Sequence, residues 1–148
     1  MLQTTHVYLF NSKGQLLLGM KKRGFGVGNR NGFGGKNHEG ETIKQTALRE
    51  LTEEAGIFID EIEKVGMLHF FYKANPSRDQ DVHIYTGIYD GNFEETEEMK
   101  PQWRDIKDIP YATMREDDAI WLPKLINKQI PFDMTFIFNE AGKIEKHF

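Results

Sequence analysis

Short apolar segments separated by turn residues follow one another along most of the chain and predict a protein rich in β-strands. Residues 6–10 (HVYLF) and 15–20 (QLLLGM) are the first two, and the Asn, Ser, Lys and Gly between them favour a hairpin turn. β-Branched and aromatic residues mark the later segments in the same way. We expect strands at residues 6–10, 15–20, 65–73, 82–89, 102–106, 132–138 and 143–147, the last two forming a hairpin.

A different pattern, with a period near four, begins after residue 42 and predicts a helix. The apolar residues that share its face are Ile43, Ala47 and Leu51. Thr42 and Gln45 fit the capping box that starts many helices. Gly56 stands where a glycine commonly ends one.

A second helix is expected over residues 118–128 (DAIWLPKLINK), with Asp117 or Asp118 near its start and Pro123 within its first two turns. Mostly strands, with one helix in the middle and one late, predict an α+β fold in which a mixed sheet lies between helices. No repeat or composition shift marks a linker. Residues 1–148 are therefore expected to form one domain.

Composition and charge narrow the possible functions. The chain has no cysteine, which excludes a thiolate nucleophile and leaves oxygen or imidazole ligands, so a bound metal is expected to be Mg²⁺ or Mn²⁺. A formal charge of -4 argues against a broad nucleic-acid surface. No apolar run approaches the roughly 18 residues of a membrane span, and the first ten residues lack a signal-peptide pattern. We expect a cytoplasmic monomer that acts on a small molecule, with neither nucleic acid nor membrane as partner.

Three glutamates gather at the end of the first predicted helix. Glu50, Glu53 and Glu54 project on neighbouring positions of one side. A solvated acidic face, with Arg49 paired to Glu53, is one interpretation. The preceding segment favours another, because six glycines within residues 23–35 let the backbone fold beside the helix. There its carbonyl oxygens can join the carboxylates around a divalent cation.

The segment from Gly35 to Ile57 resembles the Nudix box, G-x5-E-x7-R-E-U-x-E-E-x-G-U, where U is aliphatic, and matches it at all nine restricted positions. Nudix hydrolases cleave a nucleoside diphosphate linked to another moiety and use Mg²⁺, with Mn²⁺ as a possible substitute. The resemblance implies that three box glutamates and a backbone carbonyl ligate the metal, and that Arg49 orients one glutamate. The implied metal ligands are Glu50, Glu53, Glu54 and the carbonyl of Gly34 or Gly35; which glutamate acts as general base stays open.

Segments outside the box resemble the MutT-type subfamily that removes oxidised purine nucleoside triphosphates, such as the animal 8-oxo-dGTP pyrophosphohydrolases. These segments are residues 19–36, 97–103 and 114–123. The similarity implies that Asn31 binds the base and that Asp117 and Asp118 read its edge, one protonated and one ionised. Without it, the two aspartates would be interpreted as a helix cap and a first-turn acid. The further residues that it implies are Phe33, Phe70 and Tyr72 near the base, Lys21 and Lys36 near the phosphates, and Glu98 near the metal.

Two positions depart from the subfamily pattern. Arg115 occupies the place of a tryptophan that stacks on the purine, and a guanidinium can also stack on a base. His6 replaces a small polar residue and is expected to line the base site, where it could add a pH-sensitive contact.

Two rival interpretations remain open. The first is a Nudix hydrolase of another substrate, such as an undamaged dNTP, a dinucleoside polyphosphate or ADP-ribose. The second is a non-catalytic nucleotide-binding module with the same fold. The intact set of box glutamates argues against the second.

Overall fold

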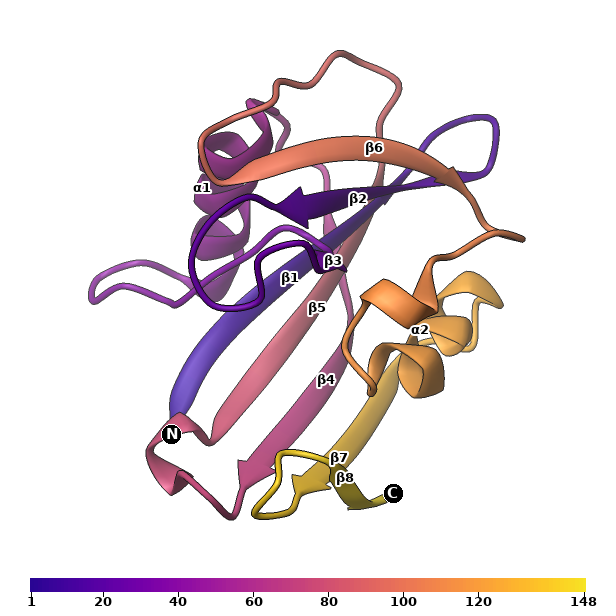
Figure 1. Ribbon diagram of the computed structural model, residues 1–148. Coiled ribbons are helices and arrows are strands. Elements are labelled where there is room, and N and C mark those ends of the chain that lie inside the picture. Colours follow the sequence, from indigo (N-terminus) through magenta and orange to yellow (C-terminus); the bar gives the residue numbers. More distant parts are fainter.

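A curved sheet of eight strands runs through the computed structural model, which describes residues 1–148 (Figure 1). Its strand order is β3-β2-β1-β5-β4-β7-β8, and β6 pairs with β2. The pairs β1–β5 and β4–β7 are parallel and the others antiparallel, so the sheet is mixed. The strands are β1 (Leu2–Phe10), β2 (Gln15–Lys21), β3 (Arg30–Asn31), β4 (Glu63–Tyr72), β5 (Gln80–Ile88), β6 (Met99–Asp105), β7 (Phe132–Phe138) and β8 (Ile144–His147).

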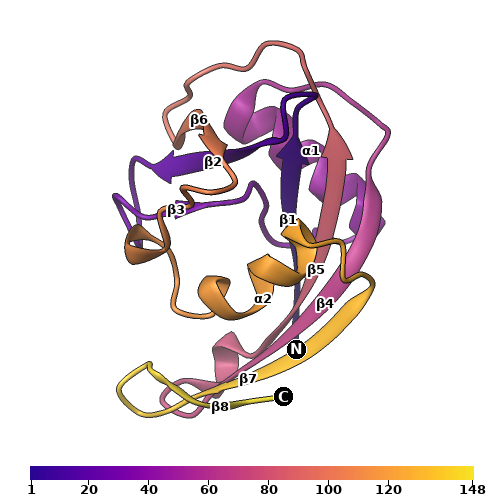
Figure 2. The same cartoon turned by 90° about the vertical axis from the view of Figure 1, so that its right-hand side faces the viewer.

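Two α-helices cover opposite faces of this sheet, α1 (Ile43–Ala55) and α2 (Asp118–Ile126) (Figure 2). Because successive side chains of a strand point to opposite faces, neighbouring residues of β1 enter different cores. Val7 packs with the apolar face of α1, whereas Tyr8 packs with Trp121 of α2. The expected α+β arrangement, a mixed sheet between helices, is confirmed. Neither α-helix is long and apolar enough to cross a membrane.

The local signals around α1 are also confirmed. The Thr42 side chain accepts a hydrogen bond from the Gln45 amide at 3.1 Å, and the Gln45 side chain accepts one from the Thr42 amide at 2.8 Å. Gly56 ends the helix with φ at 63°, in the left-handed region that glycine adopts without a steric penalty. Ala47 and Leu51 are fully buried beneath the helix.

The glycine-rich segment before α1 is held against the edge of β1. The Thr5 amide donates to the Gly35 carbonyl at 2.9 Å, and the Val7 amide donates to the Phe33 carbonyl at 2.6 Å. A Cβ atom on Gly34 would lie 1.6 Å from the Thr5 carbonyl oxygen, so only glycine permits this approach. The segment is thereby fixed between β1 and α1.

Some boundaries differ from the prediction. The first strand begins at Leu2 rather than at residue 6, because its polar first residues pair with β5 in parallel register from Leu2 opposite Gln80. β6 begins at Met99 rather than at residue 102, because Met99 is buried and pairs with Lys21 of β2. The two residues of β3 lie within the glycine-rich residues 23–35, where no strand was expected. Pairing partners far along the chain set each of these boundaries.

A histidine on β4 joins three strands on the outer surface of the sheet. His69 Nδ1 lies 2.7 Å from Asp81 Oδ1 of β5, and Nε2 lies 2.9 Å from Asp133 Oδ1 of β7. Burial alone would lower the pKa of His69, but the hydrogen bonds and charges of the two aspartates outweigh it and raise that pKa. This outer histidine cluster lies on the β4 face opposite Phe70, which enters the α2-side core.

Candidate active site

The three predicted glutamates lie where α1 faces the glycine segment. Glu54 is only 6% exposed, and its Oε1 accepts a hydrogen bond from the Gly34 amide at 2.8 Å. A Cβ atom on Gly35 would lie 2.5 Å from Glu50 Oε1, so the second glycine makes room for that carboxylate. Helix and segment together form a cradle of carboxylate and backbone groups.

Arg49 organises this cradle. Its guanidinium donates to both carboxylate oxygens of Glu41, at 3.0 and 2.8 Å, to Glu50 Oε1 at 2.8 Å and to the Lys36 carbonyl at 3.1 Å. The more exposed Glu53 lies 3.3 Å away. The pKa of Glu41 is lowered to about 2, mainly by the hydrogen bonds from Arg49. Arg49 therefore ties the middle of α1 to the preceding segment, at Lys36 and Glu41, and orients Glu50.

The buried carboxylates of the cradle hold protons more tightly than free ones. Burial is the main cause that raises the pKa of Glu54 to about 8; the Gly34 amide opposes it, and the charges of Glu50 and Glu98 add to it. Burial also raises the pKa of Glu50. Glu98 reaches this region from the loop before β6, where Arg23 lies 3.5 Å from its carboxylate. The four predicted metal-site glutamates are thus electrostatically coupled.

A pocket of about 260 Å³ opens on the α2 side of the sheet. Its lining includes many of the residues expected to bind substrate, together with several that the sequence did not identify. They are His6, Lys21, Phe25, Gly26, Asn29, Arg30, Asn31, Phe70, Tyr72, Arg78, Gln80, Val82 and Arg115. Lys21 links the pocket to the cradle, because its charge lowers the pKa of Glu54 and also that of His6.

Asp117 and Asp118, which we call the aspartate pair, lie beside this pocket and are 1% and 3% exposed. Trp121 Nε1 donates to Asp117 Oδ2 at 3.1 Å and to Asp118 Oδ1 at 3.0 Å. Asp117 precedes α2 but its side chain makes no capping hydrogen bond. The pair is therefore held by tertiary contacts and does not serve as a helix cap.

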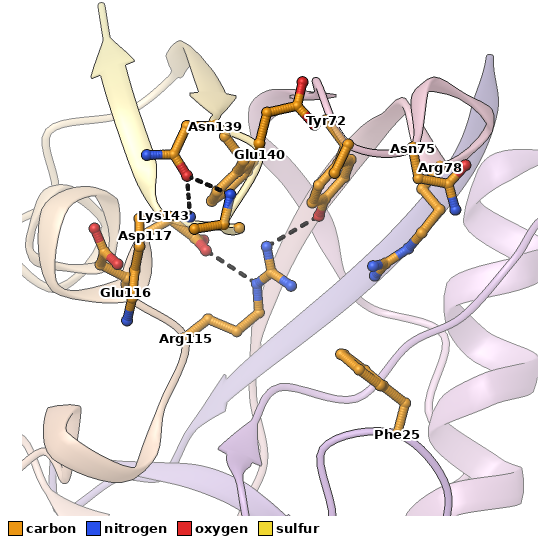
Figure 3. Close-up of a pocket in the computed structure, with 14 residues that line it drawn as sticks. Phe25, Tyr72, Asn75, Arg78, Arg115, Glu116, Asp117, Asn139, Glu140 and Lys143 are labelled. Atoms are coloured by element: carbon orange, nitrogen blue, oxygen red, sulfur yellow. Dashed lines mark hydrogen bonds and ion pairs between the residues drawn. The ribbon is translucent and has the colours of Figure 1, made fainter.

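Arg115 lines both this pocket and the small cavity that borders the aspartate pair. It also lines a neighbouring pocket of about 440 Å³, and Figure 3 shows its contacts with Asp117 and Tyr72 from that side. Its Nε donates to Asp117 Oδ1 at 3.0 Å and its Nη2 to the Tyr72 hydroxyl at 3.0 Å. The guanidinium carbon lies 5.0 Å from the centre of the Phe70 ring and 5.5 Å from that of Phe138. The guanidinium is thus already packed on protein rings and hydrogen-bonded within the chain.

The structure places Phe33 differently from the prediction and adds detail for Lys36 and His6. Phe33 is fully buried in the α1-side core, because it follows β3 and points away from the pocket. Lys36 is not among the residues that line the pocket, and its carbonyl accepts a hydrogen bond from Arg49. His6 lines the pocket, but burial and the charges of Arg115 and Lys21 lower its pKa to about 4. His6 is therefore neutral near pH 7, and a contact between it and a base would change its charge only in acidic solution.

Sequence reasoning missed Trp121 and Phe138. Trp121 lies four and three positions after the two aspartates, the spacing at which side chains share a helix face, so a signal for it existed. Phe138 lies on β7 and stacks on Tyr72, with ring centres 4.8 Å apart. No local pattern connects these two strands.

Comparison with known proteins identifies the family. A family model of the NUDIX domain matches residues 2–129. This chain belongs to the Nudix family. The Nudix protein is 48% identical over 117 residues to the oxidized purine nucleoside triphosphate hydrolase of Danio rerio. The aligned residues make up 78% of this chain and 74% of that relative. The Mus musculus protein of the same name is 48% identical over 116 residues, with the same two coverages.

Solved structures show the same fold for the Nudix protein. The crystal structure of a Mutator MutT protein from Bacillus halodurans superimposes with a TM-score of 0.85 at 20% identity, covering 100% of this chain and 97% of that one. The family that the box resemblance implied is confirmed, as is the similarity to the animal hydrolases.

The donor atoms of the Nudix cradle fit a hard divalent cation. Carboxylate and carbonyl oxygens are the ligands that Mg²⁺ and Mn²⁺ prefer, and a buried Glu54 with a pKa of about 8 would be stabilised by a neighbouring positive charge. No three acidic or histidine side chains stand around one point. Glu50 contacts Arg49 and Glu54 contacts the Gly34 amide, in each case through Oε1. A cation shared by the glutamates would therefore require them to move closer together, with Oε2 of each carboxylate available for it.

Proposed function

We propose that this Nudix protein hydrolyses oxidised purine nucleoside triphosphates, 8-oxo-dGTP foremost and 2-hydroxy-dATP as a possible further substrate, to the monophosphate and pyrophosphate. Its role is to remove damaged nucleotides from the precursor pool. The observation that carries the proposal is the link between a carboxylate cradle and a base-sized pocket bordered by a buried aspartate pair, with Lys21 acting on both. The names of the animal relatives, 48% identical, support the same substrate class.

The residues of the chain divide the work. Glu50, Glu53, Glu54 and the carbonyl of Gly34 or Gly35 would hold Mg²⁺, with Mn²⁺ as a substitute and Glu98 completing the site. When bound, the cation neutralises phosphate charge and lowers the pKa of a ligated water.

Lys21 lines the pocket, and its charge also acts on Glu54 of the cradle. Its ammonium would bind a phosphate oxygen of the substrate. Arg49 holds Glu50 in place by its 2.8 Å contact. A nucleobase in the pocket would meet Asn31, whose buried Oδ1 makes no hydrogen bond within the chain, and the edge of the aspartate pair. Unpaired buried polar atoms are costly, so a base that satisfies them gains affinity.

We further propose that the protein acts as a cytoplasmic monomer on free nucleotides, without nucleic acid or membrane as partner. Size-exclusion chromatography with light scattering tests the monomer. An oligonucleotide containing 8-oxoguanine tests the restriction to free nucleotides, since it should be neither cleaved nor bound tightly.

A substrate panel with Mg²⁺ tests the proposed reaction. Purified protein is given 8-oxo-dGTP, 2-hydroxy-dATP, dGTP, ATP, ADP-ribose and diadenosine polyphosphates, and the products are separated by chromatography. We expect the highest kcat/KM with 8-oxo-dGTP, and pyrophosphate in equal amount to the monophosphate. A higher kcat/KM with any unoxidised compound would overturn the substrate assignment, and absence of all turnover would favour the non-catalytic binding module.

A further inference from the structure

The two members of the aspartate pair have different electrostatic surroundings. Asp117 is in direct contact with a cation, since Arg115 Nε lies 3.0 Å from its Oδ1, and its second oxygen accepts from Trp121. Asp118 contacts no cationic side chain. Its Oδ1 accepts from Trp121 at 3.0 Å, while its buried Oδ2 makes no hydrogen bond.

The side chain of Asp118 also borders a small cavity next to the pocket. The cavity has a volume of about 10 Å³, and its lining residues His6, Phe70, Val82 and Arg115 also line the larger pocket. A protonated Asp118 would therefore present an O–H donor toward this space, whereas Asp117 is an anionic acceptor.

We propose that Arg115 is a specificity-determining residue: its ion pair keeps Asp117 anionic, leaves Asp118 as the proton donor, and commits the site to the edge of 8-oxoguanine over that of 2-hydroxyadenine. This inference rests on the proposed function. Arg115 acts through Asp117 and is in this sense a positioning residue.

The chemistry of the two bases supplies the reason. Guanine presents an acceptor at C6 and an amino donor at C2, whereas the keto form of 2-hydroxyadenine presents an amino donor at C6 and an acceptor at C2. If both bases bind in the same orientation, one requires the first of two adjacent carboxyls to be protonated and the other requires the second. A pair of carboxyls that can exchange the proton therefore binds both bases, whereas a pair in which a neighbouring cation fixes the proton binds only one of them.

The surroundings of the pair oppose that exchange. Moving the proton to Asp117 would leave Arg115 without its anionic partner and place the charge on Asp118, which has no cation in contact. Burial, followed by the charge of Asp117, raises the pKa of Asp118, and Arg115 and the Trp121 hydrogen bond only partly oppose this. The other titratable groups near it are His6, which lines the same cavity, and Tyr8 and Tyr111, whose own pKa values Asp118 raises. None of them is positively charged near pH 7, because the pKa of His6 is lowered to about 4.

Arg115 also favours carbonyl groups directly. Only two of its three guanidinium nitrogens donate hydrogen bonds within the chain, to Asp117 and Tyr72 (Figure 3). Because Arg115 lines the pocket and its guanidinium has donors only, the remaining N–H groups suit an oxo group, of which 8-oxoguanine carries two and keto 2-hydroxyadenine one.

The first test measures discrimination in three variants. Arg115→Met removes the charge but keeps an unbranched stem against Phe70, Arg115→Lys keeps the charge, and Arg104→Met is a charge-matched control on β6. The measured quantity is the ratio of kcat/KM for 8-oxo-dGTP to that for 2-hydroxy-dATP. A charge-assisted hydrogen bond corresponds to about ten- to hundredfold, so this ratio should fall at least about tenfold in Arg115→Met. It should change less than about threefold in Arg115→Lys and Arg104→Met.

Dissociation constants of the two nucleotides, measured in EDTA, give the same ratio without turnover. If the wild-type protein hydrolyses neither nucleotide but the affinity ratio falls in Arg115→Met, the proposed reaction fails and the role of Arg115 stands. An unchanged ratio in Arg115→Met, or a wild-type preference for 2-hydroxy-dATP, would overturn the role of Arg115 even if 8-oxo-dGTP is hydrolysed.

The second test observes the proton itself. Carboxyl signals of ¹³C-labelled aspartate, assigned with Asp117→Asn and Asp118→Asn, should show Asp118 protonated and Asp117 ionised at pH 7. This difference between the two carboxyls should be absent in Arg115→Met and present in Arg115→Lys, which keeps the charge. A protonated Asp117 in the wild-type protein would refute the inference, and a ¹H–¹⁵N spectrum of each variant verifies that it is folded.

Discussion

Replacing Glu54 by glutamine is expected to stabilise the metal-free protein while removing its activity. Glu54 is 6% exposed, and its pKa rises from 4.5 to about 8 in the folded state. The folded protein therefore binds this proton more tightly than the unfolded chain does. The protonated Glu54 side chain contributes its full stabilisation below pH 4.5. This contribution decreases as the pH rises toward 8, because Glu54 loses its proton at a lower pH in the unfolded chain than in the folded protein.

The size of the effect follows from this shift. At about 1.4 kcal/mol per pKa unit, ionising Glu54 costs the folded state about 5 kcal/mol above pH 8. Side-chain relaxation and water entry reduce such costs, so we expect Glu54→Gln to gain about 2 to 3 kcal/mol at pH 8.5 and about half of that at pH 6. The glutamine oxygen can still accept from the Gly34 amide, which donates to Oε1 at 2.8 Å in the wild type.

Urea unfolding in EDTA at the two pH values measures this gain. Glu53→Gln is the matched control, because the Glu53 side chain is 52% exposed and its replacement should change stability by less than about 0.5 kcal/mol. With Mg²⁺ added, the order should reverse, since ligand binding stabilises only a protein that retains the site. The reasoning is refuted if Glu54→Gln is no more stable than the wild type at pH 8.5, or if its gain is independent of pH.

Three further changes test the packing around the site. Trp121→Phe removes the single donor shared by the aspartate pair and should lower the free energy of unfolding by about 1 to 3 kcal/mol, measured by urea unfolding. A decrease of less than about 0.5 kcal/mol, the usual effect of a surface substitution, would contradict the shared hydrogen bond. His69→Gln should lower stability by about 1 kcal/mol at pH 5.5 and by less at pH 8.5, because a raised histidine pKa stabilises at low pH and that contribution is lost as the pH rises through it. Gly34→Ala should reduce the melting temperature far more than Gly14→Ala, because the Cβ of residue 34 would meet the Thr5 carbonyl at 1.6 Å. At Gly14 nothing lies within 4 Å, and the only cost is that of its positive φ of 76°; equal melting temperatures would argue against the close approach at Gly34.

Much of the catalytic half of the site could be predicted because its signals are local. The capping box, the apolar period and the terminal glycine each involve residues within one helix length, so they specify α1 without knowledge of the rest of the fold. The glutamates then have to lie on its surface beside the glycine segment. The sequence could not predict that Glu54 is buried, because that depends on the loop before β6, where the Thr96 hydroxyl donates to the Glu54 carbonyl at 3.0 Å.

The base-binding half depends on contacts between distant elements, and here local reasoning was less successful. Phe33 follows β3, and its pairing with Val7 turns its ring into the α1-side core, which no neighbouring residue indicates. Arg115 was expected to offer its guanidinium for stacking on a base. Its contacts with Tyr72 and Phe138 come from two other strands, and only the folded sheet brings these rings together.

His6 and Arg115, the two departures from the subfamily pattern, meet at one cavity although they lie at opposite ends of the chain. The positive charge of Arg115 is, after burial, the largest cause that lowers the pKa of His6 to about 4. A neutral imidazole can be buried beside a cation at little cost, whereas a protonated one would repel it. The two replacements are therefore electrostatically compatible only as a pair in which arginine carries the charge and histidine does not. Because Asp117 is the anion that balances Arg115, the identity of residue 6 and the protonation of the aspartate pair are parts of the same charge arrangement.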